Sequence, residues 1–459
     1  MRWRRRAQPR DGGGRSDRRR PLAIESLETR RLLAVAPAAG DDLVAVSAGE
    51  AVVLDSLLLN DTDADGHSLR ITAVTQPAHG SLAALGGGQY RYTPAAGYAG
   101  LDSFTYTVAD GIDGSDVGLV RLSVNQPIDL AAARTEILAG VTTIHSGVQP
   151  GRMVAYGPEA FAVAGYPGDA GEGPMIAAAG WGRGKVIAVP DHQMLNMATY
   201  GDTGTTGQFY RNGLAWLTGS TATTIRIVTP LQGTADWLRA QGYSRVTVSS
   251  NYTTALANAD VLVGWLGSNP SQASLDAIAG FVRGGGGLFL AEYGAGYSWW
   301  WGKAEADVPG SRLLREAGIG FPYGNRWDTG LIDATAVAAG QVGATTVLDV
   351  LADSSGFSQA AIDEAAAVMN GMFAVLPAGD TLAAELQQAY DTRIAGINPT
   401  PATPLTDSFD KALITQEMNL IKDLPAIEVT AHRTAEAVYG AIDPAAPRLV
   451  GHTVTIDTS

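Results

Sequence analysis

The stretch from residue 284 to residue 302, GGGGLFLAEYGAGYSWWWG, combines residue types that could bind or transform a ligand. An apolar run ends in Glu292, and in an open α/β sheet ligands bind beyond the carboxyl ends of the strands. Glycines after the strand allow close backbone approach, and three adjacent indoles cannot all point one way, so at least one faces solvent, a sugar or a neighbouring domain. The predicted ligand-lining residues are Gly294, Gly296, Trp299, Trp300 and Trp301.

His192 is the second candidate catalytic residue. Asp191-His192-Gln193 follows the apolar run KVIAVP, just as Glu292 follows the apolar run LFLA. The imidazole could act as a base with Glu292 as its partner carboxylate, which would suit a hydrolase. The alternative is a structural histidine and a hydrogen-bonding glutamate. Ser298 lies in no G-x-S-x-G pattern, which disfavours a serine nucleophile.

An acidic turn, Asp61-Thr62-Asp63-Ala64-Asp65-Gly66, places three carboxylates at alternate positions before a glycine. Calcium requires several hard oxygen ligands, and the spacing matches the opening of an EF-hand loop, but Thr72 stands where that loop requires Glu. The sequence therefore predicts either a calcium site or a charged Asx-rich turn. The calcium ligands that we predict are Asp61, Asp63, Asp65, Asp102 and Asp110.

Composition removes several classes of chemistry. The 459 residues include no cysteine, so disulfides, thiolate nucleophiles and cysteine metal sites are excluded. The net charge is −14 although residues 1–20 contain nine arginines, which indicates a basic targeting tail on an acidic body and argues against nucleic acid as a partner. No apolar run is long enough to predict a transmembrane segment.

The hydrophobic pattern predicts a multidomain chain. Residues 1–40 form a basic, disordered export segment, and residues 41–126 contain short β-branched runs between turn residues, typical of an all-β sandwich. From 129 to 330, strands alternate with helices, which predicts a mostly parallel, doubly wound α/β sheet. Residues 331–440 are mainly helical, with one helix over KALITQEMNLIKDL. Residues 441–459 contain an alternating strand with no visible partner.

Two elements of the α/β region carry sharper expectations. PMIAAAGWGRGKVIAVP, residues 174–190, reads as two paired strands around a glycine turn. In the helix before the four glycines, Leu275, Ile278 and Val282 recur at i, i+3 and i+7, which predicts one buried stripe.

Several phrases resemble known families. IESLETRRLLA (24–34) resembles the LEPR-XLL-type N-terminal motif of planctomycete exported proteins, with Thr29 in place of proline. NDTDADGHSLRITAVTQPAHGSL and YRYTPAAGYAGLDSFTYTVADG resemble the bacterial cadherin-like, immunoglobulin-like (Ig-like) repeats of secreted adhesins. These resemblances imply a secreted or cell-surface protein.

The α/β region resembles the N-terminal part of TRP-channel-associated factors and of enhancin-like, mucin-directed metallopeptidases. The resemblance rests on GVTTIHSGVQPGRMVAYGPEAFAV, AAAGWGRGKVIAVPDHQML, RNGLAWL and LDAIAGFVRGGGGLFLAEYGAGYSW, and more weakly on APRLVGHTVTIDTS. It implies a fold similar to class I glutamine amidotransferases, in which the turn after Glu292 would carry a cysteine that this chain lacks. For residues 441–459 the resemblance implies the first strand of a truncated β-domain.

In the peptidase family a zinc domain with HExxH follows, because two histidines one turn apart bind the metal and the glutamate activates water. None of the six histidines here begins that motif, so the chain has no such zinc site. We therefore expect a noncatalytic binding or scaffold protein, which the resemblance implies is the exported N-terminal portion of an enhancin-like, mucin- or glycoprotein-directed metallopeptidase without its zinc domain. Its expected partner is a glycoprotein, a carbohydrate or a downstream peptidase domain, and the resemblance to the channel-associated factors implies association with a membrane protein as a further alternative. The alternative is a hydrolase or carbohydrate-active enzyme using His192 and Glu292.

Overall fold

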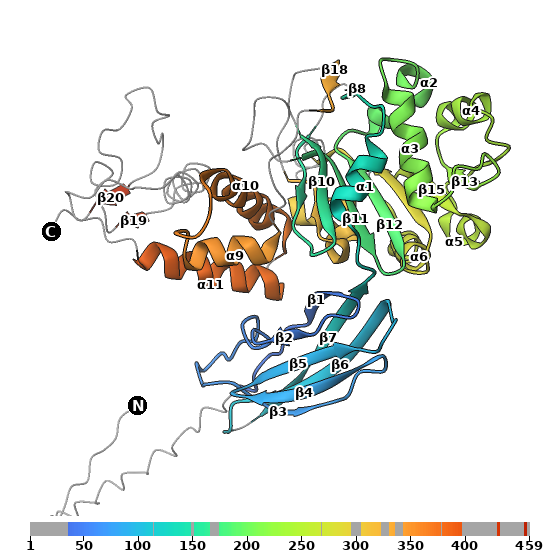
Figure 1. The fold of residues 1–459 in the computed structure, drawn as a ribbon. Helices are drawn as coiled ribbons and strands as arrows, with labels where there is room; N and C mark the ends of the chain where they lie inside the picture. The colour runs from blue at the N-terminus through green and yellow to red at the C-terminus, as the bar shows by residue number, and fades with distance from the viewer. Residues whose placement is uncertain are drawn as a thin grey trace, which may run out of the picture.

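Three units make up the part of the chain that the computed structural model describes (Figure 1). The described residues are 35–112, 114–147, 151–165, 174–267, 269–294, 304–322, 330–335, 343–377, 379–396, 429–431 and 454–456. A β-sandwich, blue in Figure 1, comes first, an α/β unit follows, and three helices in orange complete the arrangement.

The sandwich has a four-stranded and a three-stranded sheet. The first has the order β1 (Asp42–Ser47), β7 (Ser115–Asn125), β6 (Gly100–Ala109) and β3 (Arg70–Val74), and the second has the order β2 (Val52–Leu54), β5 (Gln89–Pro94) and β4 (Gly80–Gly86). Alternate residues of β6 face the core, including Phe104, Tyr106 and Val108, as the period of two predicts. Neighbouring strands of both sheets are antiparallel except β1, which pairs with β7 in parallel.

The α/β unit is built on a seven-stranded mixed sheet. Its order is β10 (Ala160–Gly165), β11 (Pro174–Trp181), β12 (Gly184–Val189), β16 (Gly287–Ala291), β15 (Val261–Trp265), β13 (Arg226–Thr229) and β14 (Arg245–Val248). The five strands from β12 to β14 are parallel, whereas β10 and β11 are antiparallel to their neighbours. The predicted pairing around the glycine turn is the β11–β12 hairpin.

Helices cover both faces of this sheet, which explains the continuous apolar runs in β12 and β16. On one face lie α1 (Leu130–Ile137), α3 (Thr206–Thr218) and α4 (Gln232–Ala240). On the other lie α5 (Tyr252–Ala255), α6 (Gln272–Arg283) and α8 (Pro309–Leu314). The predicted stripe of α6 is confirmed, since Leu275, Ile278 and Val282 are all buried against the sheet.

The third unit consists of α9 (Ala344–Ala352), α10 (Gln359–Val375) and α11 (Thr381–Gly396), where the sequence predicted helices. Smaller pairings involve β17 (Ile319–Gly320) with β9 (Val154–Ala155), and β18 (Leu331–Asp333) with β8 (Thr143–His145). The C-terminal strand was expected to lack a partner, but β20 (Val454–Ile456) pairs in parallel with β19 (Val429–Ala431). The helix predicted over 411–424 lies outside the described residues.

The sandwich is attached to both other units. Where β7 enters the α/β unit, Asn125 Oδ1 accepts a hydrogen bond from Gly182 N at 2.9 Å, and Glu159 Oε2 accepts one from Ile128 N at 2.8 Å. On the helical side, Thr381 at the start of α11 donates its hydroxyl to the buried Asp42 of β1. The sandwich therefore contacts the rest of the chain along β1 as well as at the end of β7.

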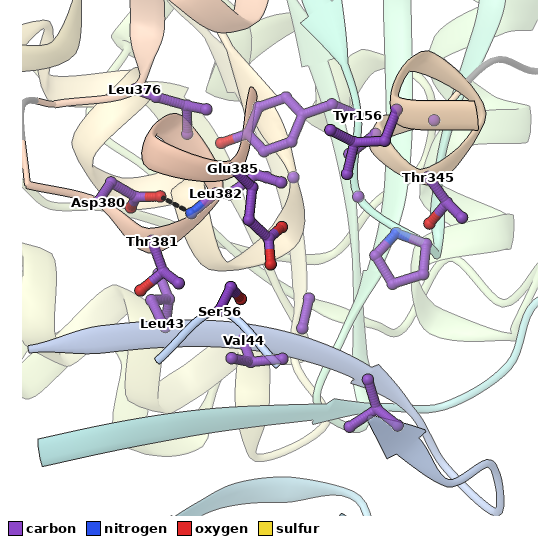
Figure 2. Close-up of a pocket in the computed structure, with 18 of the residues that line it drawn as sticks. Leu43, Val44, Ser56, Tyr156, Thr345, Leu376, Asp380, Thr381, Leu382 and Glu385 are labelled. Atoms are coloured by element: carbon purple, nitrogen blue, oxygen red, sulfur yellow. Dashed lines mark hydrogen bonds between the residues drawn. The ribbon is translucent and has the colours of Figure 1, made fainter. Parts of the chain in front are cut away.

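A cavity of about 250 Å³ lies where the three units meet (Figure 2). Its walls include Leu43 of β1, Tyr156 after β9 and Leu376 after α10, together with Glu385 of α11. Burial raises the pKa of Glu385 and that of Asp380, and Arg315 Nη1 lies 4.0 Å from Asp380 Oδ2.

Candidate functional site

Residues from three parallel strands converge at the carboxyl edge of the sheet. β12 is followed by Asp191 and His192, β15 ends at Trp265, and β16 is followed by Glu292. Because β16 lies between β12 and β15, these side chains are brought together although they are up to 101 positions apart in the sequence. The predicted pair, His192 and Glu292, is thus placed at one edge.

Glu292 is fully buried. Its Oε1 accepts hydrogen bonds from Trp265 Nε1 at 3.0 Å and from Tyr293 N at 3.3 Å. A Cβ at Gly310 of α8 would lie 2.8 Å from Glu292 Cγ, so only glycine fits against this side chain. Burial, with a smaller contribution from the charge of Glu292, raises the pKa of Tyr252 to about 12. The glutamate therefore lies beneath the edge and binds the indole above it.

His192 begins a short 3₁₀ helix, η1 (His192–Leu195), which Asp191 caps by accepting from Gln193 N at 2.8 Å. Its ring stacks on Trp265 with 4.9 Å between centroids and lies 6.3 Å from the ring of Tyr293. The His192 side chain is 32% exposed, so a ligand can reach it. Trp265 joins the two predicted residues, since it stacks on one and donates to the other.

Sequence reasoning missed Trp265 and His145. Trp265 could have been found, because it ends the apolar run VLVGW as Glu292 follows LFLA. His145 lies on β8, stacks on Tyr200 at 3.8 Å, and accepts a hydrogen bond from Gly147 N at Nδ1. Burial lowers the pKa of His145, and the charge of Asp191 opposes this. No sequence pattern indicated that His145 would approach Asp191, because β8 belongs to a separate two-stranded sheet.

The remaining predicted ligand residues are only partly described. Gly294 is buried, and a Cβ there would lie 2.6 Å from the carbonyl oxygen of Phe321, so the turn requires glycine. Gly296, Trp299, Trp300, Trp301 and Ser298 lie outside the described residues. The described part of the site therefore bears two histidines, each stacked on an aromatic ring, and two buried carboxylates, Asp191 and Glu292.

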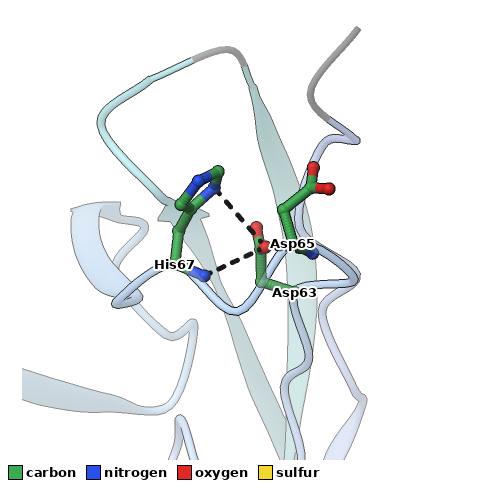
Figure 3. Close-up of side chains that lie close together, drawn as sticks. All are labelled: Asp63, Asp65 and His67. Atoms are coloured by element: carbon green, nitrogen blue, oxygen red, sulfur yellow. Dashed lines mark hydrogen bonds and ion pairs between the residues drawn. The ribbon is translucent and has the colours of Figure 1, made fainter. Parts of the chain in front are cut away.

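The acidic turn in the sandwich brings together a different set from the one predicted. Asp63, Asp65 and His67 have ligand atoms within 4.8 Å of one another (Figure 3). Asp110, from the turn after β6, approaches the same ring, with 3.5 Å between its Oδ2 and His67 Nδ1. His67 was not among the predicted ligands.

Asp102 does not belong to this group. It lies eight residues before Asp110, near the start of the extended strand β6, which separates the two by about 26 Å at about 3.3 Å per residue. Its carboxylate instead accepts from Tyr92 Oη at 2.8 Å and from Ala78 N and His79 N. The expectation that Asp102 and Asp110 complete one site is wrong, because residues at opposite ends of a strand cannot share an ion.

Asp61 is also outside the group of close ligand atoms. Its Oδ1 accepts hydrogen bonds from Tyr106 Oη at 2.8 Å and from Gly40 N at 2.7 Å, so Asp61 links strand β6 to the loop before β1. Burial raises its pKa.

Three segments match models of known protein families. Residues 34–123 match the bacterial Ig domain, residues 18–37 match the planctomycete extracellular motif, and residues 115–334 match the model described as TRPM8, N-terminal domain, of the TRP-channel-associated factors. These are the components that the sequence phrases indicated. The Ig and extracellular matches indicate an extracellular or surface protein, and none of the described helices has the length and apolar character required to cross a bilayer.

No curated protein matches the chain. Among solved structures it is similar to the endo-fucoidan hydrolase MfFcnA4 of glycoside hydrolase family 107, at 25% identity over 20% of this chain and 14% of that one, with a TM-score of 0.16. A nucleoside hydrolase-related protein from Saccharophagus degradans shows 16% identity over 20% of this chain and 26% of that one, also with a TM-score of 0.16. The shared segments are a minor part of those structures, and the likeness establishes no activity for this chain.

Proposed function

We propose that the chain is a noncatalytic, extracellular binding protein that recognises a carbohydrate or glycoprotein at the carboxyl edge of its α/β sheet. The observation that carries the proposal is the arrangement of Trp265 between His192 and Glu292. An indole and an imidazole stacked at an accessible edge offer the kind of aromatic surface on which the C–H face of a sugar ring packs.

The same arrangement disfavours proton transfer by Glu292. A general base must come within hydrogen-bond reach of the proton that it removes. Glu292 is fully buried, and one of its oxygens is bound to Trp265 and to its neighbour's amide, so a substrate would have to displace the indole to reach that oxygen. The chain also has no cysteine to supply the nucleophile of an amidotransferase-like site.

The match to the channel-associated factor model over 115–334 supports a further part of the proposal. We regard the α/β unit as an amidotransferase-like architecture used for recognition, equivalent to the noncatalytic N-terminal region of enhancin-like peptidases that act on mucins. In that role the edge would dock a glycoprotein. The equivalence to the peptidase region rests on similarity of fold alone, whereas the proposed binding rests on the side chains at the edge.

Binding of the full-length chain to an immobilised mucin, before and after enzymatic removal of its glycans, tests the proposal. We expect binding that depends on the glycans and that falls about 10-fold or more in His192→Ala, since truncating a central aromatic contact typically costs that much. His79→Ala is the matched control, because His79 also stacks on an aromatic ring, Tyr98 at 4.2 Å, but lies in the sandwich. Binding that is equal for both variants, or that persists on the deglycosylated mucin, would contradict the proposed site.

A further inference from the structure

We infer that the end of the sandwich remote from the α/β unit binds a divalent transition-metal ion of the Zn²⁺ class through His67 and the carboxylates around it. The site joins the turn between β2 and β3 to the turn between β6 and β7. β6 and β7 are antiparallel and Gly100 pairs with Val124, so the residues after Ala109 lie at the opposite end from the junction at Asn125.

The ligand atoms of Asp63, Asp65 and His67 lie within 4.8 Å of one another, and Asp110 brings a further carboxylate oxygen close to His67. His67 Nδ1 lies 3.5 Å from Asp63 Oδ1 and 3.5 Å from Asp110 Oδ2. These distances exceed those of a good N–H···O hydrogen bond, and His67 Nδ1 has no hydrogen-bond partner among the residues that the structure describes. Two atoms that each bind a tetrahedral zinc ion at about 2.0–2.2 Å lie about 3.4 Å apart, so the spacing is that of neighbouring ligands.

A second observation comes from Asp63. Its side chain is 2% exposed, and Oδ1 accepts hydrogen bonds from Asp65 N and His67 N. No donor in the described part of the chain reaches Oδ2, which is buried as well. Figure 3 shows this carboxylate between the His67 ring and the Asp65 side chain. A buried carboxylate oxygen without a donor costs free energy, and a bound cation removes that cost.

The donor types decide the class of ion. Calcium, which the aspartates alone suggested, prefers six to eight oxygen ligands. Here the ligand atoms include an imidazole nitrogen, which lies 3.5 Å from an oxygen of Asp63 and 3.5 Å from an oxygen of Asp110. Imidazole suits zinc and its neighbours in the first transition row. Asp65 is exposed at the rim and Asp110 is buried beneath the ring, so ions could enter from the Asp65 side.

The competing interpretation is a protonated His67 held between two carboxylates without a metal. Calorimetric titration of the full-length chain with Zn²⁺, and separately with Ca²⁺, distinguishes the two. We expect Zn²⁺ binding whose affinity falls at least ~10-fold in His67→Ala. Mutating even a residue that only hydrogen-bonds to a metal ligand typically lowers metal affinity by that factor. Asp63→Asn, which keeps the Oδ1 acceptor of the turn, should lose affinity as well, and His79→Ala should bind as the unmodified chain does.

Cobalt(II) provides a spectroscopic measurement of binding that does not depend on calorimetry. Its visible absorption should appear on binding and change in His67→Ala, because the band responds to the nitrogen ligand. Each variant is compared with the unmodified chain by circular dichroism in chelator, so that loss of binding is not mistaken for loss of fold. Zn²⁺ affinity that is the same with and without His67, or binding of Ca²⁺ alone that ignores this substitution, would overturn the inference.

Discussion

At the scale of single residues, the hydrogen bond from Trp265 Nε1 to Glu292 Oε1 is the contact on which the proposed binding edge depends. It links the indole on which His192 stacks to the buried carboxylate, and it occupies one of the two oxygens of Glu292. A buried acceptor that loses its hydrogen-bond donor typically costs about 1–3 kcal/mol of stability.

A double-mutant cycle of Trp265→Phe and Glu292→Gln measures this contact. Trp265→Phe should lower the free energy of unfolding by about 1–3 kcal/mol, because the buried carboxylate loses a donor. In the Glu292→Gln background the same change should cost less, with a coupling energy of about 1 kcal/mol. Urea denaturation of the four proteins gives the values, and effects that add without coupling would show that the contact contributes nothing.

At the scale of elements, α6 and the turn after it approach the start of β12 closely, at the end of that strand opposite the candidate site. A Cβ at Gly184 would lie 2.1 Å from the carbonyl oxygen of Val282 and 2.3 Å from that of Gly286. Both neighbours are backbone atoms, so they cannot move aside as a flexible side chain would. By contrast, Gly280 on the exposed side of α6 has no atom within 4 Å of its built Cβ.

Gly184→Ala and Gly280→Ala therefore form a matched pair with opposite expected signs. Gly184→Ala should destabilise by about 1–3 kcal/mol or more through overpacking. Gly280→Ala should stabilise by about 0.5–1 kcal/mol, since alanine is the better helix former. Chemical denaturation measures both, and a tolerated Gly184→Ala would mean that the contact between α6 and β12 is looser than described.

Local patterns predicted most elements, and tertiary pairing accounts for what they missed. The stripe of Leu275, Ile278 and Val282 and the hairpin around Gly182 follow from periodicity and turn chemistry. Nothing local indicates that β9 leaves the main sheet to pair with β17, or that β1 pairs in parallel with β7. Only part of the candidate site was predicted, for the same reason. His192 and Glu292 follow apolar runs that the sequence shows, whereas His145 lies on β8, a strand of another sheet.

At the scale of the whole molecule, buried carboxyl groups lie where the sandwich meets the three helices. Asp42 is almost fully buried against Thr381, and desolvation raises its pKa from 3.8 to about 7 despite the hydrogen bond from Thr381. Burial also raises the pKa of Asp380 and Glu385 beside the cavity in Figure 2. The folded state therefore favours the protonated carboxyls at this junction.

This junction predicts a pH dependence of stability. A group whose pKa rises on folding stabilises the fold fully below its unfolded pKa, near 4 for Asp42, and that contribution is lost as pH rises through about 7. The loss for Asp42 is at most on the order of 4 kcal/mol. Asp42→Asn, which keeps an acceptor for Thr381, should thus gain stability relative to the unmodified chain between pH 4 and pH 8.

The matched control is Asp236→Asn, because the Asp236 side chain is 60% exposed and pairs with Arg239 on the surface of α4, away from Asp42. Thermal melts at several pH values compare the three proteins. If the difference between Asp42→Asn and the unmodified chain stays constant from pH 4 to pH 8, the Asp42 carboxyl does not titrate on folding as described.

The central claim is that the edge around Trp265 binds a glycan without cleaving it. The most direct measurement places the full-length chain with a glycosylated mucin and records, on the same samples, the bound fraction and any released peptide or sugar by mass spectrometry. The account predicts saturable binding that is lost in His192→Ala, with product no higher than in the protein-free sample. Product that accumulates with the unmodified chain and disappears in His192→Ala would contradict it.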